Sequence, residues 1–267
     1  MFQEIVDVLW NKPIGSGYFR IGLQGRHDYR TARPGQFVML QLGARGPHLL
    51  RRPFSIHRLT GADRAPRGIE LLYKVVGPCT RRMSRLREGD GVDLLGPLGK
   101  GFRLVPHARR IILAAGGIGV APLFFWAQEL IAGRIDPAGL QVFLGGRSRG
   151  DILCRDAFVE LGLTVRMTTD DGSAGDHCLV TRPLETILAR GAADVIYACG
   201  PMEMLKCVAG LAARNGIACQ LSIETMMACG LGACLGCAVK RRDRADAYWH
   251  ACVDGPVIDA HLLDLDP

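Results

Sequence analysis

Short hydrophobic runs alternate with glycine, proline and aspartate over residues 1–103. Runs of this length, separated by frequent turn residues, are typical of strands in a barrel or a sandwich. A short helix is predicted at 80–86, ahead of a last strand at 92–95. The other predicted strands lie at 5–10, 18–23, 37–42, 54–59 and 69–76. We therefore expect an antiparallel β-barrel or a sandwich over this part of the chain.

Residues 104–218 follow a different pattern, in which fully apolar runs alternate with helical stretches. Apolar runs of this kind form strands buried on both faces, and the helices between them connect parallel neighbours. The predicted strands lie at 111–115, 140–144, 163–167 and 195–199, and the predicted helices at 121–132, 156–161, 183–190 and 202–215. We expect an α/β domain with a parallel sheet covered on both faces.

The periodicity weakens from residue 219, where four cysteines begin to crowd into a glycine-rich stretch. A segment as short as 219–267 is too small to hold a core alone, so we expect a metal group to organise it. The predicted fold class is multidomain β plus α/β. It consists of a barrel at 1–103, an α/β domain at 104–218 and a small C-terminal segment at 219–267.

The composition supports folded domains and argues against nucleic acid as a partner. Of the 267 residues, 48% are hydrophobic, which provides for sizeable cores and excludes a disordered chain. The net charge is +7, but the arginines are spread singly or in pairs and aromatic residues make up only 6%. A nucleic-acid-binding surface would instead show clustered basic residues with interleaved aromatics.

The sequence also predicts a cytoplasmic protein without a membrane span. Glu4 lies in an N-terminal stretch that lacks the basic start of a signal peptide. Residues 111–127 carry no charge, but they contain several glycines and a proline and are too few to cross a bilayer. Without export, the cysteines are expected to be thiols or metal ligands rather than disulfides.

The most specific motif is Cys229-x4-Cys234-x2-Cys237, followed by Cys252. This spacing is that of plant-type [2Fe–2S] ligation, and the four cysteines are the candidate metal ligands. The residues between them are mostly small, which lets backbone N–H groups approach the sulfurs. A structural zinc site and chance remain the alternatives, although zinc sites usually use two paired knuckles around a longer loop.

A glycine loop follows the first predicted parallel strand, with Gly117, Gly119 and Pro122 in a G-x-G-x-x-P pattern. A strand, a glycine turn and a helix start suit a pyrophosphate, because the helix N-terminus offers free N–H groups. The pattern differs from the Rossmann fingerprint, and an ordinary tight turn is the alternative.

Two more loops end predicted strands of the same sheet. Cys199, Gly200 and Pro201 precede a predicted helix, and residues 169–173 read Thr-Asp-Asp-Gly-Ser. Open α/β sheets bind ligands at the carboxyl ends of their strands, so these loops are expected to face the same crevice. For 169–173 a plain turn is an equally good reading.

Within the barrel half, Arg52, Pro53, Phe54 and Ser55 form an Arg-Pro-Phe-Ser strand. Arginine suits a bidentate phosphate contact, and the serine hydroxyl can donate to a ring nitrogen. Proline removes a backbone donor, so a surface edge strand without a ligand is the alternative.

The next strand and helix of the barrel half carry further candidates. Tyr73 can pack on an aromatic ring, and Thr80 can cap the short helix and bind phosphate. Beside them in sequence are Leu72, Lys74 and Cys79.

In this order, the motifs resemble the ferredoxin-reductase-type flavoproteins along nearly the whole chain. The resemblance implies that Arg52 binds the pyrophosphate of FAD and that Ser55 lies beside flavin N5. Phe54 stands where many members have tyrosine. The implied FAD set is Arg52, Pro53, Phe54, Ser55, Leu72, Tyr73, Lys74, Cys79 and Thr80, and the implied NAD set is Gly117, Gly119, Pro122, Cys199, Gly200 and Pro201.

A narrower resemblance is carried by residues 222–237 and 251–257, with support from 94–102 and 169–173. These look like the electron-transfer subunits of bacterial dihydroorotate dehydrogenase, an NAD-dependent enzyme of pyrimidine biosynthesis. The resemblance implies FAD, one [2Fe–2S] cluster, and a TIM-barrel partner subunit that holds FMN, in a heterotetramer of two of each. It also implies that electrons pass from FMN through the cluster and FAD to NAD+, and that acid–base work on dihydroorotate belongs to the partner.

Two departures and two alternatives accompany this resemblance. Cys79 stands where the family usually has glycine. A cysteine would be strained there if the position needs a positive φ. Arg147 and Arg149 would attract the 2′-phosphate of NADP, which leaves the preference between NAD and NADP open. The alternatives are a subunit of a ferredoxin:NADP oxidoreductase or sulfide dehydrogenase, and a zinc-stabilised nucleotide-binding regulator without turnover.

Overall fold

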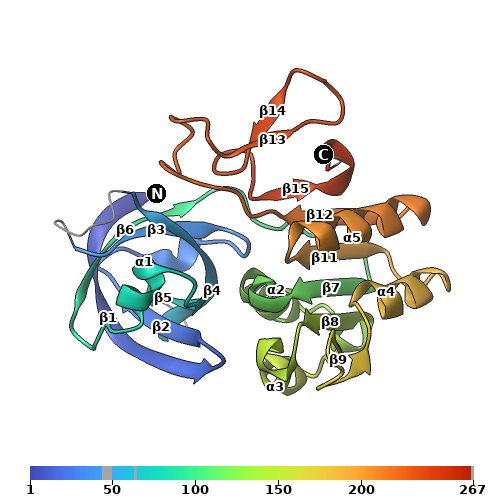
Figure 1. Ribbon diagram of the computed structural model, residues 1–267, viewed down its shortest axis with the longest axis horizontal. Coiled ribbons are helices and arrows are strands. Elements are labelled where there is room, and N and C mark those ends of the chain that lie inside the picture. The colour runs from blue at the N-terminus through green and yellow to red at the C-terminus, as the bar shows by residue number, and fades with distance from the viewer. Residues whose placement is uncertain (44–49, 63–64, 266–267) are drawn as a thin grey trace.

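The computed structural model describes residues 1–43, 50–62 and 65–265 of the chain. Figure 1 shows a barrel built by the N-terminal part of the chain beside a sheet flanked by helices. The C-terminal segment lies across the top of both. The two fold classes expected from the hydrophobic pattern are therefore confirmed, and the third segment sits where the other two parts meet.

The barrel is closed and antiparallel, with strand order β1-β2-β5-β4-β3-β6. Its inward positions are apolar, and Val6, Ile21 and Ile56 are fully buried in its core. The helix α1 (Pro78–Met83) follows β5, and the short 3-10 helix η1 (Tyr29–Thr31) follows β2. The strands are β1 (Phe2–Gly15), β2 (Tyr18–Gln24), β3 (Phe37–Gln41), β4 (Arg52–Ala62), β5 (Ala65–Lys74) and β6 (Gly91–Leu98).

The second part is a seven-stranded sheet of order β10-β9-β8-β7-β11-β12-β15. All neighbouring strands are parallel except β15, which runs antiparallel to β12 at the edge. The strands are β7 (Ile111–Gly116), β8 (Leu140–Gly146), β9 (Thr164–Thr169), β10 (Asp176–His177), β11 (Val195–Cys199), β12 (Ala218–Ser222) and β15 (Val257–Asp259).

Helices cover both faces of this sheet, as the apolar strands predict. One core cluster joins Ile112 and Ile196 to residues of α4 and α5, and another joins Ile111 and Leu113 to residues of α2 and α3. The uncharged run at 111–127 therefore divides into β7, a 3-10 turn and the start of α2. None of the helices in the described ranges is long and apolar enough to span a membrane. The helices are α2 (Val120–Ala132), α3 (Arg155–Glu160), α4 (Thr181–Leu188) and α5 (Met202–Arg214), with 3-10 turns η2 (Gly117–Gly119), η3 (Pro137–Gly139), η4 (Arg149–Asp151) and η5 (Ala260–Leu262).

Strand β12 is an element that the hydrophobic pattern does not indicate. Gln220 interrupts its apolar positions, yet this side chain is only 4% exposed. Its amide satisfies backbone groups of Arg103, accepting from the nitrogen and donating to the oxygen, both at 3.0 Å. The segment expected to begin at residue 219 therefore shares its first residues with the sheet. It also contains a small antiparallel hairpin, β13 (Ala238–Lys240) and β14 (Tyr248–His250).

Candidate redox site

Four cysteines gather in the loop after β12 and in the turn after β14. Cys237 and Cys252 are buried and their Sγ atoms lie 3.2 Å apart, although they are separated by a hairpin. Cys229 is half-buried and Cys234 is exposed. In the described ranges, no three His, Cys, Asp or Glu side chains are placed to hold one metal ion. The structure thus brings the last two predicted ligands into contact and keeps the first two on the same loop.

Backbone N–H groups of this loop point at the sulfurs. Leu231 donates to Cys229 Sγ at 3.3 Å, and Gly232 donates to Cys252 Sγ at 3.2 Å. Donation from Leu231 lowers the pKa of the Cys229 thiol to about 6, whereas burial raises the pKa of Cys252 to about 12. A thiolate at Cys252 therefore needs a cation beside it. Sulfur ligands with N–H donors fit an iron–sulfur cluster, whose potential such donors tune.

The cysteine loop packs on the barrel. Gly230 has a φ of +73°, and a Cβ there would lie 2.7 Å from Cγ of Met39 in β3. Met39 is in turn the register partner of Pro53 in β4. The loop therefore lies one strand away from the Arg-Pro-Phe-Ser strand. Nearby, the Lys100 nitrogen donates to the Gly255 oxygen at 2.5 Å, which joins the 94–102 and 251–257 motifs.

The residues predicted to meet FAD fall on β4, β5 and the start of α1. Arg52, Phe54 and Ser55 are half-buried on β4, and so is Cys79 on α1. Burial raises the pKa of the Cys79 thiol, and the charges of Arg52 and Arg82 oppose that shift. Cys79 is the second residue of a right-handed helix, so the cysteine brings no backbone strain. The structure thus places Arg52 and Cys79 within electrostatic reach of each other.

Other FAD candidates already have partners inside the protein. Tyr73 is 2% exposed, and its hydroxyl donates to Asn11 Oδ1 at 3.0 Å. Thr80 Oγ1 accepts from the backbone nitrogens of Val76 and Gly77, at 2.9 and 3.1 Å, and so caps α1. Leu72 is buried as well. These three side chains are therefore less open to a ligand than the half-buried side chains of β4.

The two glycine loops predicted for NAD touch one another. They follow the neighbouring strands β7 and β11 at their carboxyl ends. A Cβ on Gly119 would lie 2.5 Å from the Cys199 carbonyl carbon, and a Cβ on Gly200 would lie 3.0 Å from the Gly116 Cα. Backbone therefore approaches backbone without room for a side chain. Pro122 lies in the first turn of α2, and Pro201 is the residue before α5.

The third loop, 169–173, joins the loop after β8. The Arg149 guanidinium donates to the Ser173 oxygen at 2.8 Å, and Ser173 Oγ donates to Asp171 Oδ1 at 2.6 Å. Arg149 is therefore held by protein groups. Ser173, which accepts from its guanidinium, is itself bonded to the Asp171 carboxylate. Because its guanidinium is bonded within the protein, Arg149 is less available to the 2′-phosphate of NADP.

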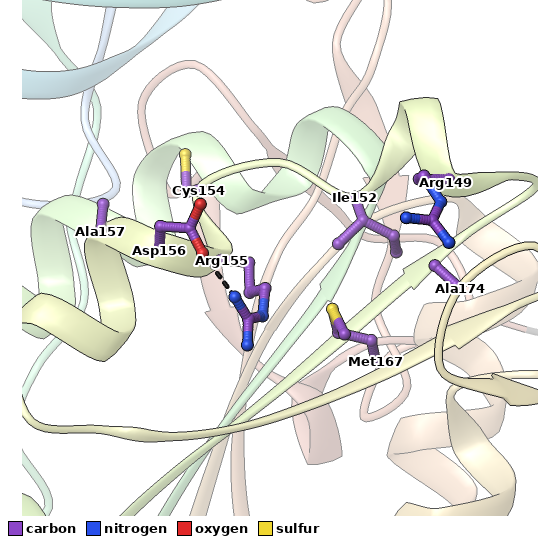
Figure 2. Close-up of a pocket in the computed structure, with 8 residues that line it drawn as sticks. All are labelled: Arg149, Ile152, Cys154, Arg155, Asp156, Ala157, Met167 and Ala174. Atoms are coloured by element: carbon purple, nitrogen blue, oxygen red, sulfur yellow. Dashed lines mark hydrogen bonds and ion pairs between the residues drawn. The ribbon is translucent and has the colours of Figure 1, made fainter.

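Beside this network lies an open pocket of about 410 Å3 (Figure 2). Its charges are partnered, because Arg155 pairs with Asp156 at 2.6 Å and Arg149 bonds Ser173. The glycine loops do not line it, so the pocket and the predicted NAD loops are separate features. The lining residues are Arg149, Ile152, Cys154, Arg155, Asp156, Ala157, Met167 and Ala174.

A buried polar cluster between the barrel and the sheet domain has no counterpart in the sequence motifs. His57 is fully buried, and its Nδ1 donates to the Ala121 oxygen of α2 at 3.0 Å. Its Nε2 lies 3.7 Å from Glu70 Oε1 and 3.9 Å from Cys154 Sγ. Burial lowers the pKa of His57 to about 3, and the nearby charges of Arg20 and Arg58 act in the same direction.

This cluster predicts acid sensitivity of the fold. The unfolded chain protonates His57 below its ordinary pKa of about 6.5, whereas the folded protein keeps it neutral. The unfolded state therefore binds more protons, and stability falls as the pH drops from about 6.5 toward 3, by at most ~1.4 kcal/mol per pH unit. We expect His57→Asn, which keeps a donor for Ala121, to flatten this slope between about pH 6.5 and 5. Thermal midpoints at one scan rate measure it, and an unchanged slope contradicts the neutral buried histidine.

Comparison with known proteins gives the following similarities. The profile of the iron-sulfur cluster binding domain of dihydroorotate dehydrogenase B matches residues 224–264, and that of the oxidoreductase NAD-binding domain matches 113–210. The chain is 36% identical to the dihydroorotate dehydrogenase B (NAD(+)) electron transfer subunit of Caldanaerobacter subterraneus subsp. tengcongensis, over 94% of each chain. It is 39% identical to the subunit of the same name from Listeria monocytogenes serovar 1/2a, over 99% of this chain and 100% of that one.

Solved structures agree on the fold. The structure of an NADH-dependent reduced ferredoxin-NADP oxidoreductase, described in work on flavin-based electron bifurcation, matches with a TM-score of 0.83 and 27% identity. That match covers 98% of this chain and 90% of the other. A ferredoxin NADP+ reductase from Neisseria gonorrhoeae, with bound FAD and NADP, matches with a TM-score of 0.67 and 17% identity over 80% of this chain and 92% of the other.

Proposed function

Because this chain belongs to the family of dihydroorotate dehydrogenase B electron transfer subunits, we propose that it carries electrons from a catalytic partner subunit to NAD+. It is an oxidoreductase subunit of pyrimidine biosynthesis, and its cofactors are FAD, a [2Fe–2S] cluster and NAD. The observation that supports the electron path is the contact between the cysteine loop and Met39, the partner of Pro53 in β4.

When bound, the cluster supplies one-electron transfer and FAD links it to hydride exchange with NAD+. We assign the cluster ligands to Cys229, Cys234, Cys237 and Cys252. The N–H groups of Leu231 and Gly232 stabilise the negative charge on two of these sulfurs.

For FAD, we propose that the Arg52 guanidinium binds the pyrophosphate and that Ser55 lies beside the flavin ring. Thr80 holds the start of α1 in place through its cap. For NAD, we propose that the dinucleotide contacts the backbone of two loops. One contains Gly117, Gly119 and Pro122, and the other contains Cys199, Gly200 and Pro201. The proposed FAD set also includes Pro53, Phe54, Leu72, Tyr73, Lys74 and Cys79.

We propose that the work divides along the chain, with FAD at 1–103, NAD at 104–218 and the cluster at 219–267. The last part is built into the sheet through β12 and β15. No residue of this chain is assigned a role as acid or base toward dihydroorotate, so that role falls to the partner. The cytoplasm, which holds NAD+ and reduced thiols, is the proposed location.

The partner is proposed to be a TIM-barrel subunit that holds FMN, in a heterotetramer of two of each. Its docking face is proposed around the cysteine loop, where Leu231, Leu235 and Val253 are 47%, 57% and 46% exposed. Exposed apolar side chains around a redox centre suit a protein partner, because association removes them from water.

Charged substitutions on this face test the docking. We expect Leu231→Asp combined with Leu235→Asp to weaken binding of the partner by about 10- to 100-fold, because an apolar contact becomes a buried charge. Calorimetry or analytical ultracentrifugation with the purified partner measures the affinity. Leu179→Asp, at a leucine that is 65% exposed and lies outside the four-cysteine segment, is the control and should leave it unchanged. Equal loss in both variants would contradict this face.

The experiment that tests the function is capture of the partner from native extract, with flavin and iron analysis of the complex. Co-purification of an FMN-containing TIM-barrel protein, with two irons per copy of this chain, supports the proposal. Co-purification of a larger flavin subunit bearing [4Fe–4S] motifs would support the alternative, a ferredoxin:NADP oxidoreductase or sulfide dehydrogenase. The structural similarity to the NADH-dependent reduced ferredoxin-NADP oxidoreductase is the observation that favours this alternative.

A further inference from the structure

Three polar side chains join the barrel to the sheet domain beside the glycine loop. The Tyr18 hydroxyl, on β2, donates to Asp151 Oδ1 in η4 at 2.7 Å. The Lys74 ammonium, on β5, donates to the Tyr18 hydroxyl at 2.9 Å and to Asp151 Oδ1 at 3.0 Å. Each pair of these groups is thus in direct contact. Hydrogen bonds that involve a charged group are about twice as strong as neutral ones.

The side chains and backbone around this triad are closely packed. Tyr18 is 2% exposed, and the Lys74 ammonium lies 4.5 Å from its ring centroid. Next to it, a Cβ on Gly150 would collide with the Ser16 side chain at the β1–β2 turn. The barrel hairpin therefore rests directly on η4, the turn that follows strand β8.

The triad also lies at the proposed NAD loop. A Cβ on Gly117 would be 3.8 Å from the Tyr18 hydroxyl, closer than any other non-neighbouring group. Gly117 is the loop residue with a φ of +51°. This interdomain contact therefore lies beside the loop that is proposed to receive the dinucleotide.

We propose that Tyr18, Lys74 and Asp151 form an interdomain latch that positions the glycine loop against the flavin barrel and so sets the geometry of hydride exchange between NAD(H) and FAD. This inference rests on the proposed function. In the exchange with NADH, one C–H bond of the nicotinamide breaks, its hydrogen and both electrons pass to FAD, and NAD+ leaves. Tyr18 and Asp151 are positioning residues, because they act through the placement of the loop, while Lys74 also belongs to the proposed FAD set.

Hydride transfer is the step that such a latch controls. A displacement of about 1 Å at reacting atoms can cost on the order of 100-fold in rate. The domains keep other contacts, such as that of His57 with Ala121, so loss of the latch changes their orientation rather than separating them. The latch thus predicts a change in rate with little change in stability.

Tyr18→Phe, Asp151→Asn and the double variant test this prediction in the FAD- and cluster-loaded protein. Anaerobic mixing with NADH gives the limiting rate of FAD reduction at saturation and, separately, the affinity for NADH. We expect each single variant to lower the limiting rate about 10-fold or more and the double variant to lose no more than either, because both break one network. The affinity for NADH should change less than about threefold, with normal FAD content and melting temperature.

Lys240→Met is the matched control. It breaks another lysine–aspartate pair of the same length, since Lys240 Nζ lies 3.0 Å from Asp264 Oδ2 in the C-terminal segment. We expect the wild-type rate of FAD reduction in this variant. Wild-type rates in the Tyr18 and Asp151 variants would overturn the latch, and so would rate losses that merely follow lost FAD or a lowered melting temperature. If NADH fails to reduce the FAD of the wild-type protein, the proposed function is at fault instead.

Discussion

Replacing Cys234 by serine should abolish electron transfer between the partner subunit and NAD+ while NADH still reduces the bound FAD. A serine hydroxyl is a poor substitute for a thiolate on iron, so the cluster is expected to be lost or poorly formed. Activity in the complete complex should fall by about two orders of magnitude or more. Iron analysis and electron paramagnetic resonance report the cluster, and anaerobic reduction by NADH reports the flavin.

Cys207→Ser is the matched control for this experiment. Cys207 lies on α5, is exposed, and falls outside the four-cysteine motif. We expect this variant to keep the cluster and full activity. Loss of FAD from the Cys234 variant would contradict the separation of flavin and cluster sites, since their proposed ligands lie on different segments.

Replacing Gly119 by alanine should block the NAD half-reaction. The added methyl group would lie 2.5 Å from the Cys199 carbonyl carbon and 2.7 Å from the Gly200 nitrogen, so two backbone loops must move apart. Overpacking of this kind typically costs about 1–3 kcal/mol of stability. Because both loops are proposed to hold the dinucleotide, we expect the rate of FAD reduction by NADH to fall about 100-fold or more. Stopped-flow absorbance measures it.

Gly210→Ala provides the control, because Gly210 lies within α5 where a Cβ meets only the flexible end of Arg214 at 3.3 Å. Alanine in a helix is favoured over glycine by about 0.5–1 kcal/mol, so this variant should be as stable as wild type or more so. It should also keep the wild-type rate. A Gly119 variant that binds and oxidises NADH normally would show that the dinucleotide binds elsewhere.

The local elements of the fold were predictable because hydrophobic periodicity is a local property. The apolar runs at 111–115 and 195–199 became β7 and β11, and the paired glycine loops at their ends came together as the parallel order requires. Strand β12 was missed for a physical reason. Its buried Gln220 looks polar in the sequence, and only its hydrogen bonds to Arg103 make burial possible.

The candidate site divides in the same way. Arg52 and Ser55 lie half-buried on β4, and their contact with FAD stays a prediction. The helix cap expected of Thr80 is present, and the Tyr73 hydroxyl has a protein partner in Asn11, while the contacts of both residues with FAD stay predictions. Whether a side chain points outward depends on neighbours that are distant in the sequence, such as Asn11 for Tyr73.

The sequence by itself determined the cysteine spacing, the glycine loops and the order of the three segments, because these depend on residues close together along the chain. The tertiary structure alone decided which side chains lie between the segments. Tyr18 and Asp151 are 133 positions apart and belong to unremarkable turns and strands, yet their oxygens meet at 2.7 Å. A contact of that kind leaves no periodic pattern, because it arises only when the barrel and the sheet pack against each other.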